Sequence, residues 1–140
     1  MTTVNLNELE LNEFVGQINP RQHCKATFPL LAAHGSKKLA TVYFELEPGD
    51  HLGRHTDSAE ELLLVLEGEI QAFVGEESGV VSAGSLVLIP EMVPHDLHNT
   101  GIGRAKVLGV FGGANNIVAT FDEAMNPTES NIVDTARLFG

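Results

Sequence analysis

Residues 49–68 read GDHLGRHTDSAEELLLVLEG, and this stretch decides the fold. Its second half contains an unbroken apolar run, residues 62–66, and a glycine closes the stretch. A short apolar run that ends at glycine is typical of a β-strand leading into a tight turn. Successive side chains of a strand point to opposite faces, so His55 and Asp57 share a face, and Glu61 has the same parity. The stretch therefore predicts an imidazole and at least one carboxylate converging beside a strand.

Glycine and proline punctuate the chain in the same way on both sides of this stretch. Short apolar or alternating runs, nearly all closed by a turn residue, lie at 39–46, 61–67, 69–75, 80–82, 85–89 and 105–111. This spacing is typical of an all-β sandwich or barrel, and no long helix fits within residues 39–111. Residues 6–14 are too short, and too ambiguous between the helix and strand periods, to be assigned, and are treated as an N-terminal arm. The tail after Phe121 is expected to be irregular, with one short helix at its end.

The composition fits a single globular domain, residues 1–140. Hydrophobic residues make up 43% of the chain and charged residues 19%, which is ordinary for a protein with a packed core. Lys and Arg number 8 against 19 Asp and Glu, and the net charge is −11. A phosphate backbone requires cationic patches, so this charge argues against nucleic acid and anionic membranes as partners.

Other broad classes are also disfavoured by the sequence. The longest apolar runs, such as residues 62–66 and 86–89, are far shorter than the ~20 residues of a membrane-spanning helix. The N-terminus has no basic region followed by an apolar stretch, so a cytoplasmic location is expected. Cys24 is the only cysteine, which excludes a disulfide within the chain and predicts a small packed residue.

The histidines cluster in two short segments at strand junctions. Four of the six lie there, His51 and His55 in one segment and His95 and His98 in the other. If the strands of His55 and His95 are neighbours, two imidazoles and one or two carboxylates meet. That donor set suits Fe(II), Mn(II), Ni(II), Cu(II) or Zn(II). The sequence therefore favours a site for one divalent transition metal.

The first histidine segment resembles the first motif of the cupins, a family of small β-barrel proteins. That motif is a glycine, five residues, His-x-His, three or four residues, a glutamate, six residues and a glycine. Here it falls on Gly49, His55, Asp57, Glu61 and Gly68. Asp57 stands where the family has its second histidine.

The second segment resembles the second cupin motif, with its Pro-x-Gly, histidine and asparagine. It falls on Gly84, Pro90, Met92, His95 and Asn99, and Met92 replaces the internal glycine. The resemblance implies a double-stranded β-helix, or jelly-roll, barrel with a core at about residues 27–121. The motif glycines are expected to adopt turn conformations with positive φ.

The resemblance also implies a ligand set, because cupins bind one divalent metal inside the barrel. Carried over, the ligands are His55, Asp57, Glu61 and His95, and the ion is Fe, Mn, Ni or Zn. Asp57 adds a negative charge and shifts the donor set from three nitrogens and one oxygen towards two of each, which favours harder ions. Two alternatives stay open: Asp57 caps a turn, and Glu61 is an exposed residue of an acidic turn. A further alternative is that the site binds no metal.

The remaining histidines are expected to play other roles. His51 shares the parity of His55 but lies near the turn at residues 48–49, which predicts a rim position. His98 has the wrong parity relative to His95 and is expected to be structural.

Three functions are compatible with the sequence. The leading hypothesis is a metal-dependent enzyme, of dioxygenase or isomerase type, that acts on a small organic molecule in the barrel mouth. Asp57 and Glu61 are its candidates for catalytic proton transfer. The second is a non-catalytic module that binds a small ligand. The third is a 2-oxoglutarate-type oxygenase with a triad of His55, Asp57 and His95, in which Arg104 pairs with the cosubstrate carboxylate.

Small cupins commonly form homodimers, and the resemblance extends this expectation to the present chain. Residues 2–20 are the candidate arm that adds to the sheet of the partner and covers an exposed strand edge.

Overall fold

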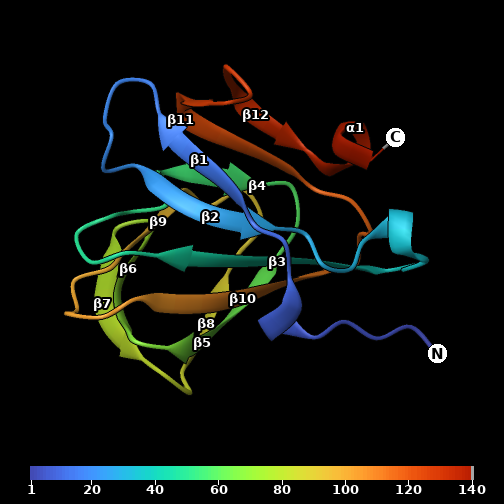
Figure 1. The fold of residues 1–140 in the computed structure, drawn as a ribbon, viewed down its shortest axis with the longest axis horizontal. Helices are drawn as coiled ribbons and strands as arrows, with labels where there is room; N and C mark the ends of the chain where they lie inside the picture. The colour runs from blue at the N-terminus through green and yellow to red at the C-terminus, as the bar shows by residue number, and fades with distance from the viewer. Residues whose placement is uncertain (140) are drawn as a thin grey trace.

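The computed structural model describes residues 1–139, and their fold is all-β, as predicted (Figure 1). Apart from two 3₁₀ turns and one short helix, every regular element is a strand. In chain order the elements are η1 (Leu6–Glu8), β1 (Asn12–Gly16), β2 (His23–Thr27), η2 (Ala32–His34), β3 (Leu39–Leu46), β4 (His55–Asp57), β5 (Glu61–Glu67), β6 (Glu69–Val74), β7 (Glu77–Ser82), β8 (Leu86–Ile89), β9 (His95–His98), β10 (Ala105–Gly112), β11 (Val118–Asn126), β12 (Ser130–Asp134) and α1 (Thr135–Phe139).

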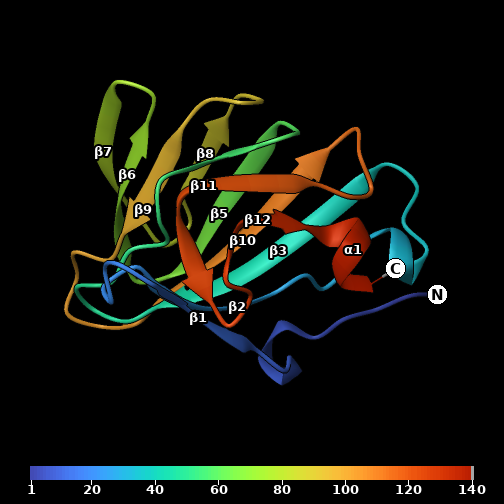
Figure 2. The same ribbon diagram turned by 90° about the horizontal axis from the view of Figure 1, so that it is seen from above.

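The strands form one antiparallel sheet that curls around a common interior (Figures 1 and 2). Their order is β7-β6-β9-β4-β11-β1-β2-β3-β10-β5-β8, and β12 pairs with β11 beside this path. The order brings β4 and β9, which carry the two histidine segments, next to each other. Figure 2 shows the N-terminus and α1 on the same side of the molecule.

Alternation sorts even the uniformly apolar run of β5 into two faces. Leu63 and Val65 are buried inside the barrel, whereas Leu62 and Leu66 on either side of them are exposed. The run therefore contributes to both the core and the outer surface, as the period of a strand requires.

The core consists of two clusters of buried apolar side chains. The first includes Phe44, Leu46, Leu63, Val65, Ile70, Leu97 and Val107. The second includes Leu31, Phe111, Ile117, Phe121, Met125 and Val133. Cys24 belongs to the first cluster, where burial and then the nearby charge of Asp50 raise the pKa of its thiol to about 12. A thiol with this pKa is unreactive, and Cys24 is the packed residue that the sequence predicts.

The turn glycines behave as predicted. Gly49, Gly68 and Gly84 have φ values of 85°, 85° and 92°, which residues with a Cβ rarely adopt. Met92 has φ 62°, so this position keeps the left-handed backbone that suits the glycine of the motif. The Met92 N–H donates to the carbonyl oxygen of Asp57 at 3.0 Å, which ties this loop to β4.

The C-terminal tail is more regular than the expected irregular segment. β11 continues past Phe121 to Asn126, and β12 pairs with it in antiparallel register. In β12 the buried Val133 follows the exposed Ile132, an alternation too short to stand out in the sequence. The predicted short helix is present as α1.

Part of the predicted N-terminal arm belongs to the sheet of its own chain. β1 pairs with β2 along Asn12–Val15 and with β11 at Val15 and Gly16.

Among the described residues, no helix is both long enough and apolar enough to cross a bilayer.

Candidate metal centre

The sheet register places the two motif histidines directly opposite each other. β4 and β9 pair in antiparallel register with His55 opposite His95, as the sequence analysis requires for a shared site. On its other side β4 pairs with β11, where His55 lies opposite Phe121. The His55 and Phe121 rings stack with centroids 4.4 Å apart, which restricts the orientation of the imidazole.

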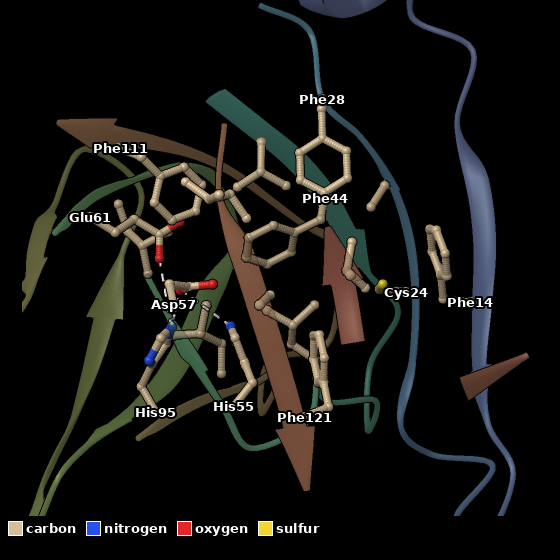
Figure 3. Close-up of a pocket in the computed structure, with 18 of the residues that line it drawn as sticks. Phe14, Cys24, Phe28, Phe44, His55, Asp57, Glu61, His95, Phe111 and Phe121 are labelled. Atoms are coloured by element: carbon tan, nitrogen blue, oxygen red, sulfur yellow. Dashed lines mark ion pairs between the residues drawn. The ribbon is translucent and has the colours of Figure 1, made fainter. Parts of the chain in front are cut away.

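All four predicted ligand residues line one cavity of about 70 Å³ (Figure 3). His55, Asp57, Glu61 and His95 are each at most 5% exposed. Burial of Glu61 excludes the alternative in which it belongs to an exposed acidic turn. Figure 3 shows the four polar side chains gathered on one side, with Phe14, Phe28 and Phe44 on the other. The cavity lies between the two core clusters, because residues of both line it.

The carboxylate of Asp57 faces both histidines. Its Oδ2 atom lies 3.0 Å from Nε2 of His95 and 3.5 Å from Nε2 of His55. Glu61 approaches from β5, with Oε1 3.6 Å from Nε2 of His95. The ligand atoms of His55, Asp57 and His95 all lie within 4.8 Å of one another, which is close enough for one ion to bind all three.

Backbone carbonyls fix which nitrogen of each imidazole faces this centre. Nδ1 of His55 lies 2.7 Å from the carbonyl oxygen of Gly53, and Nδ1 of His95 lies 2.9 Å from that of Val93. A carbonyl only accepts hydrogen bonds, so each Nδ1 donates. In the neutral imidazoles both Nε2 atoms then present lone pairs to the centre, which is the usual arrangement of metal-binding histidines.

Two buried polar atoms at the centre lack hydrogen bonds. Neither Oδ2 of Asp57 nor Nε2 of His95 makes a well-aligned hydrogen bond to any described residue, and at 3.0 Å the two atoms meet each other only as a charge pair. A buried polar atom without a partner is costly, and native proteins rarely leave one unsatisfied. A divalent cation would satisfy both atoms. The donor set, two imidazoles and two carboxylates, therefore fits a divalent transition metal.

The environment separates the pKa values of the two carboxyl groups. Burial alone would raise the pKa of Asp57, but the close His55 and His95 lower it to about 2. Burial raises the pKa of Glu61, and the charge of Asp57 adds to this effect against the opposing influence of His95. Burial would lower the pKa of His95, but Asp57 and then Glu61 raise it to about 10. Without metal, the centre therefore holds an ion pair between Asp57 and His95.

His51 and His98, the other histidines of the two segments, form a separate group outside the lining of this cavity. Nδ1 of His51 lies 3.0 Å and Nε2 of His98 lies 3.1 Å from Oδ2 of Asp96, and the two rings stack at 4.6 Å. His51 thus lies away from the centre, as its position near the turn predicts, and His98 has a structural contact, as its parity predicts. Sequence reasoning missed Asp96, although its position between the two histidines of β9 is a usable signal. Unlike Asp57, its Oδ2 atom has hydrogen-bond partners.

Arg104 does not play the predicted role. Its Nε atom lies 2.7 Å from Oε1 of Glu47, and it does not line the cavity. Arg104 lies just before β10, where its side chain meets acidic groups of β3 and the turn after it. The prediction that Arg104 pairs with the cosubstrate carboxylate of a 2-oxoglutarate-type oxygenase is therefore wrong.

Known protein families and solved structures give an independent comparison. The sequence profile of the cupin domain matches residues 42–111, half of the chain. No protein with a curated description matches the chain by sequence.

Solved structures share the fold at low sequence identity. A putative sugar phosphate isomerase from Acidithiobacillus ferrooxidans is 18% identical over 97% of this chain and 92% of its own, with a TM-score of 0.65. A Bacillus subtilis oxalate decarboxylase with Mn(II) centres is 19% identical over 84% of this chain, with a TM-score of 0.72, and the match spans 31% of that longer chain. A polyketide cyclase from Streptomyces resistomycificus is 18% identical over 80% and 79% of the two chains, with a TM-score of 0.65. With the matching profile, both motifs and the curled antiparallel sheet, the chain belongs to the cupin family.

Proposed function

We propose that this cupin binds one divalent transition metal and uses it to catalyse proton transfer on a small carbonyl compound in the barrel, as an isomerase does. The ligands are His55, Asp57, Glu61 and His95. The observation that carries the proposal is the pair of buried atoms without hydrogen bonds, Oδ2 of Asp57 and Nε2 of His95. The Mn(II) centres of the structurally similar oxalate decarboxylase support a metal in this kind of barrel.

The side chains of the site have distinct tasks. A bound ion supplies Lewis acidity towards a carbonyl oxygen. His55 and His95 keep their orientation because Gly53 and Val93 accept their Nδ1 protons. Asp57 stays ionised, with a pKa of about 2, and supplies a negative charge that balances part of the charge of the ion.

The unlike carboxyl groups favour isomerase over dioxygenase chemistry. Two carboxyls whose environments push their pKa values apart are typical of acid and base pairs. Burial raises the pKa of Glu61, so its carboxylate is the stronger base of the two: it takes a proton from the substrate and returns it at another atom. Removal of a proton next to a carbonyl and its return at another atom balance without an oxidant.

Metal content tests the first half of the proposal. We expect near-stoichiometric metal by elemental mass spectrometry of untagged protein, and its loss in His55→Ala and His95→Ala variants that remain folded. His98→Ala is the matched control, because it removes a histidine of the other histidine–carboxylate group. No metal after reconstitution with Fe(II), Mn(II), Ni(II) and Zn(II) would refute the proposal.

Proton exchange tests the second half. Butanone incubated with the metal-loaded protein in D₂O is expected to gain deuterium beside its carbonyl group, followed by NMR. Glu61→Gln is expected to abolish the gain, whereas Glu60→Gln at the neighbouring exposed position is expected to preserve it. Metal binding without exchange of butanone would favour the non-catalytic binding module.

A further inference from the structure

The charged side chains that line the cavity are all acids or histidines. Asp57 and Glu61 supply two carboxyl groups, and no lysine or arginine is among the described residues of the lining. Arg54, which directly precedes His55, turns outward, with Nε 3.6 Å from Oδ2 of Asp122 at the surface. An anionic substrate group would therefore find no lysine or arginine in the cavity, and His95 is already paired with Asp57.

A bound metal ion would not change this balance. The two charges of a divalent ion are cancelled by the carboxylates of Asp57 and Glu61, and neutral imidazoles add none. With a histidine at position 57 the same ligand set would keep one positive charge. Asp57 and Glu61 are each 3% exposed, so an added anion would not be screened by water. An uncompensated charge in such a medium is strongly disfavoured.

The remaining walls are apolar and the space is small. Phenylalanine side chains form much of them, namely Phe14, Phe28, Phe44, Phe111 and Phe121. The volume of about 70 Å³ leaves room for roughly five to seven non-hydrogen atoms, at ~10–15 Å³ for each water-sized position. A ligand that fills the space presents an apolar body to the phenylalanines and one polar atom to the centre.

We propose that the cavity selects small, uncharged, largely apolar carbonyl compounds, and that Asp57 is the residue that excludes anions. This inference rests on the proposed function for the role of the metal. It adds the class of substrate and a specificity-determining residue.

Isobutyramide and isobutyrate form a suitable pair of probes, because they have nearly the same shape and differ in charge. Each is titrated into zinc-loaded and metal-free protein, and binding is followed by methyl chemical shifts of cavity residues. Wild-type protein is expected to bind isobutyramide at least about tenfold more tightly, because the buried cavity offers the charge of isobutyrate no compensating charge. Equal or tighter binding of isobutyrate, or no binding of isobutyramide, would overturn the inference.

The Asp57→His variant tests the assigned residue. In the zinc-loaded form, loss of the Asp57 carboxylate leaves one positive charge of the ion uncancelled, which is expected to reduce the preference for isobutyramide about tenfold or to reverse it. Asp122→His, the same substitution at an exposed position, is the matched control and is expected to keep the wild-type preference. An unchanged preference in a folded, metal-loaded Asp57→His variant would contradict the role of Asp57.

The two proposals fail in different ways. If the protein binds no metal, the proposed function fails, but the metal-free titration still measures the preference, since the lining without lysine or arginine is the same. If metal binds and isobutyrate binds as well as isobutyramide, only the inference about substrate class fails.

Discussion

The carboxylate of Glu61 on β5 occupies the space that a side chain at Gly109 on β10 would fill. A Cβ atom placed on Gly109 would overlap Oε2 of Glu61 and lie 2.8 Å from Cγ1 of Val42. β5 and β10 are neighbours in the sheet. Because Gly109 has no side chain, the carboxylate of Glu61 has room to lie over β10 and still face the cavity.

Gly109→Ala is therefore expected to displace Glu61 without removing any ligand atom. We expect a clear loss of metal affinity, measured by competition with a chelator, and a destabilisation of about 1–3 kcal/mol from overpacking, measured by urea unfolding. Gly79→Ala is the control, because a Cβ there meets no atom within 4 Å. Unchanged metal affinity in Gly109→Ala would show that Glu61 is not a ligand.

The carbonyl of Gly53 orients His55, and Gly53→Ala is expected to disturb it. Gly53 has φ 112°, and an added Cβ would lie 2.5 Å from Nε2 of the buried Gln22. Gly84→Ala is the matched control, because Gly84 has φ 92° but open space around it. Both variants are expected to lose about 1–2 kcal/mol of unfolding free energy from backbone strain, and only Gly53→Ala is expected to lose metal affinity as well. Equal metal affinity of the two variants would contradict the role of the Gly53 carbonyl.

Metal binding is expected to release protons. The pKa of His95 is raised to about 10 without metal, so at pH 7 the ion must displace a proton from its Nε2 atom. Affinity should therefore rise with pH up to about pH 10, by roughly tenfold per pH unit for each proton displaced. Glu61, whose pKa is also raised, adds a second proton wherever it is protonated.

Calorimetry in buffers of different ionisation enthalpy counts these protons. His98→Ala is expected to release as many as wild type. Metal binding at pH 7 without proton release would show that His95 is not a ligand in its deprotonated form.

A homodimer is expected to form through the outer face of β5 and β8. Leu62, Leu86 and Leu88 on this face are 40%, 61% and 59% exposed, and Leu62 pairs with Leu88. Exposed apolar patches of this kind commonly mark interfaces, whereas β1 of the predicted arm already pairs within its own chain.

Light scattering is expected to give twice the chain mass of 15.0 kDa. Leu88→Glu is expected to give the monomer mass, and Ile18→Glu, at another exposed apolar position, the dimer mass. A monomeric wild-type protein at micromolar concentration would contradict the dimer, and a dimeric Leu88→Glu variant would contradict this interface.

The sequence predicts the parts of the site that depend on local spacing. The shared face of His55 and Asp57 follows from strand periodicity alone, whereas the place of His95 in the site follows from the resemblance to the second cupin motif. The closing glycines of the runs, such as Gly68, likewise predict the turns, because few other residues adopt their φ values.

Other parts depend on register or on backbone atoms and cannot be predicted in this way. The contact between Gly109 and Glu61 requires knowing that β5 and β10 are neighbours and how they align. The hydrogen bonds from His55 and His95 to the carbonyls of Gly53 and Val93 use backbone groups that every residue has, so no residue type in the sequence indicates them. Arg104 is close to His95 in sequence, but the direction of its side chain depends on the strand that follows it.

Metal binding inside the barrel is tested by an anomalous-scattering map from crystals of the metal-loaded protein, collected at the absorption edge of the metal. We expect one strong peak inside the barrel, about 2.0–2.2 Å from Nε2 of His55, Nε2 of His95 and a carboxylate oxygen of Asp57. An occupied peak only between His51, Asp96 and His98, or no peak in the barrel at saturating metal, would contradict it.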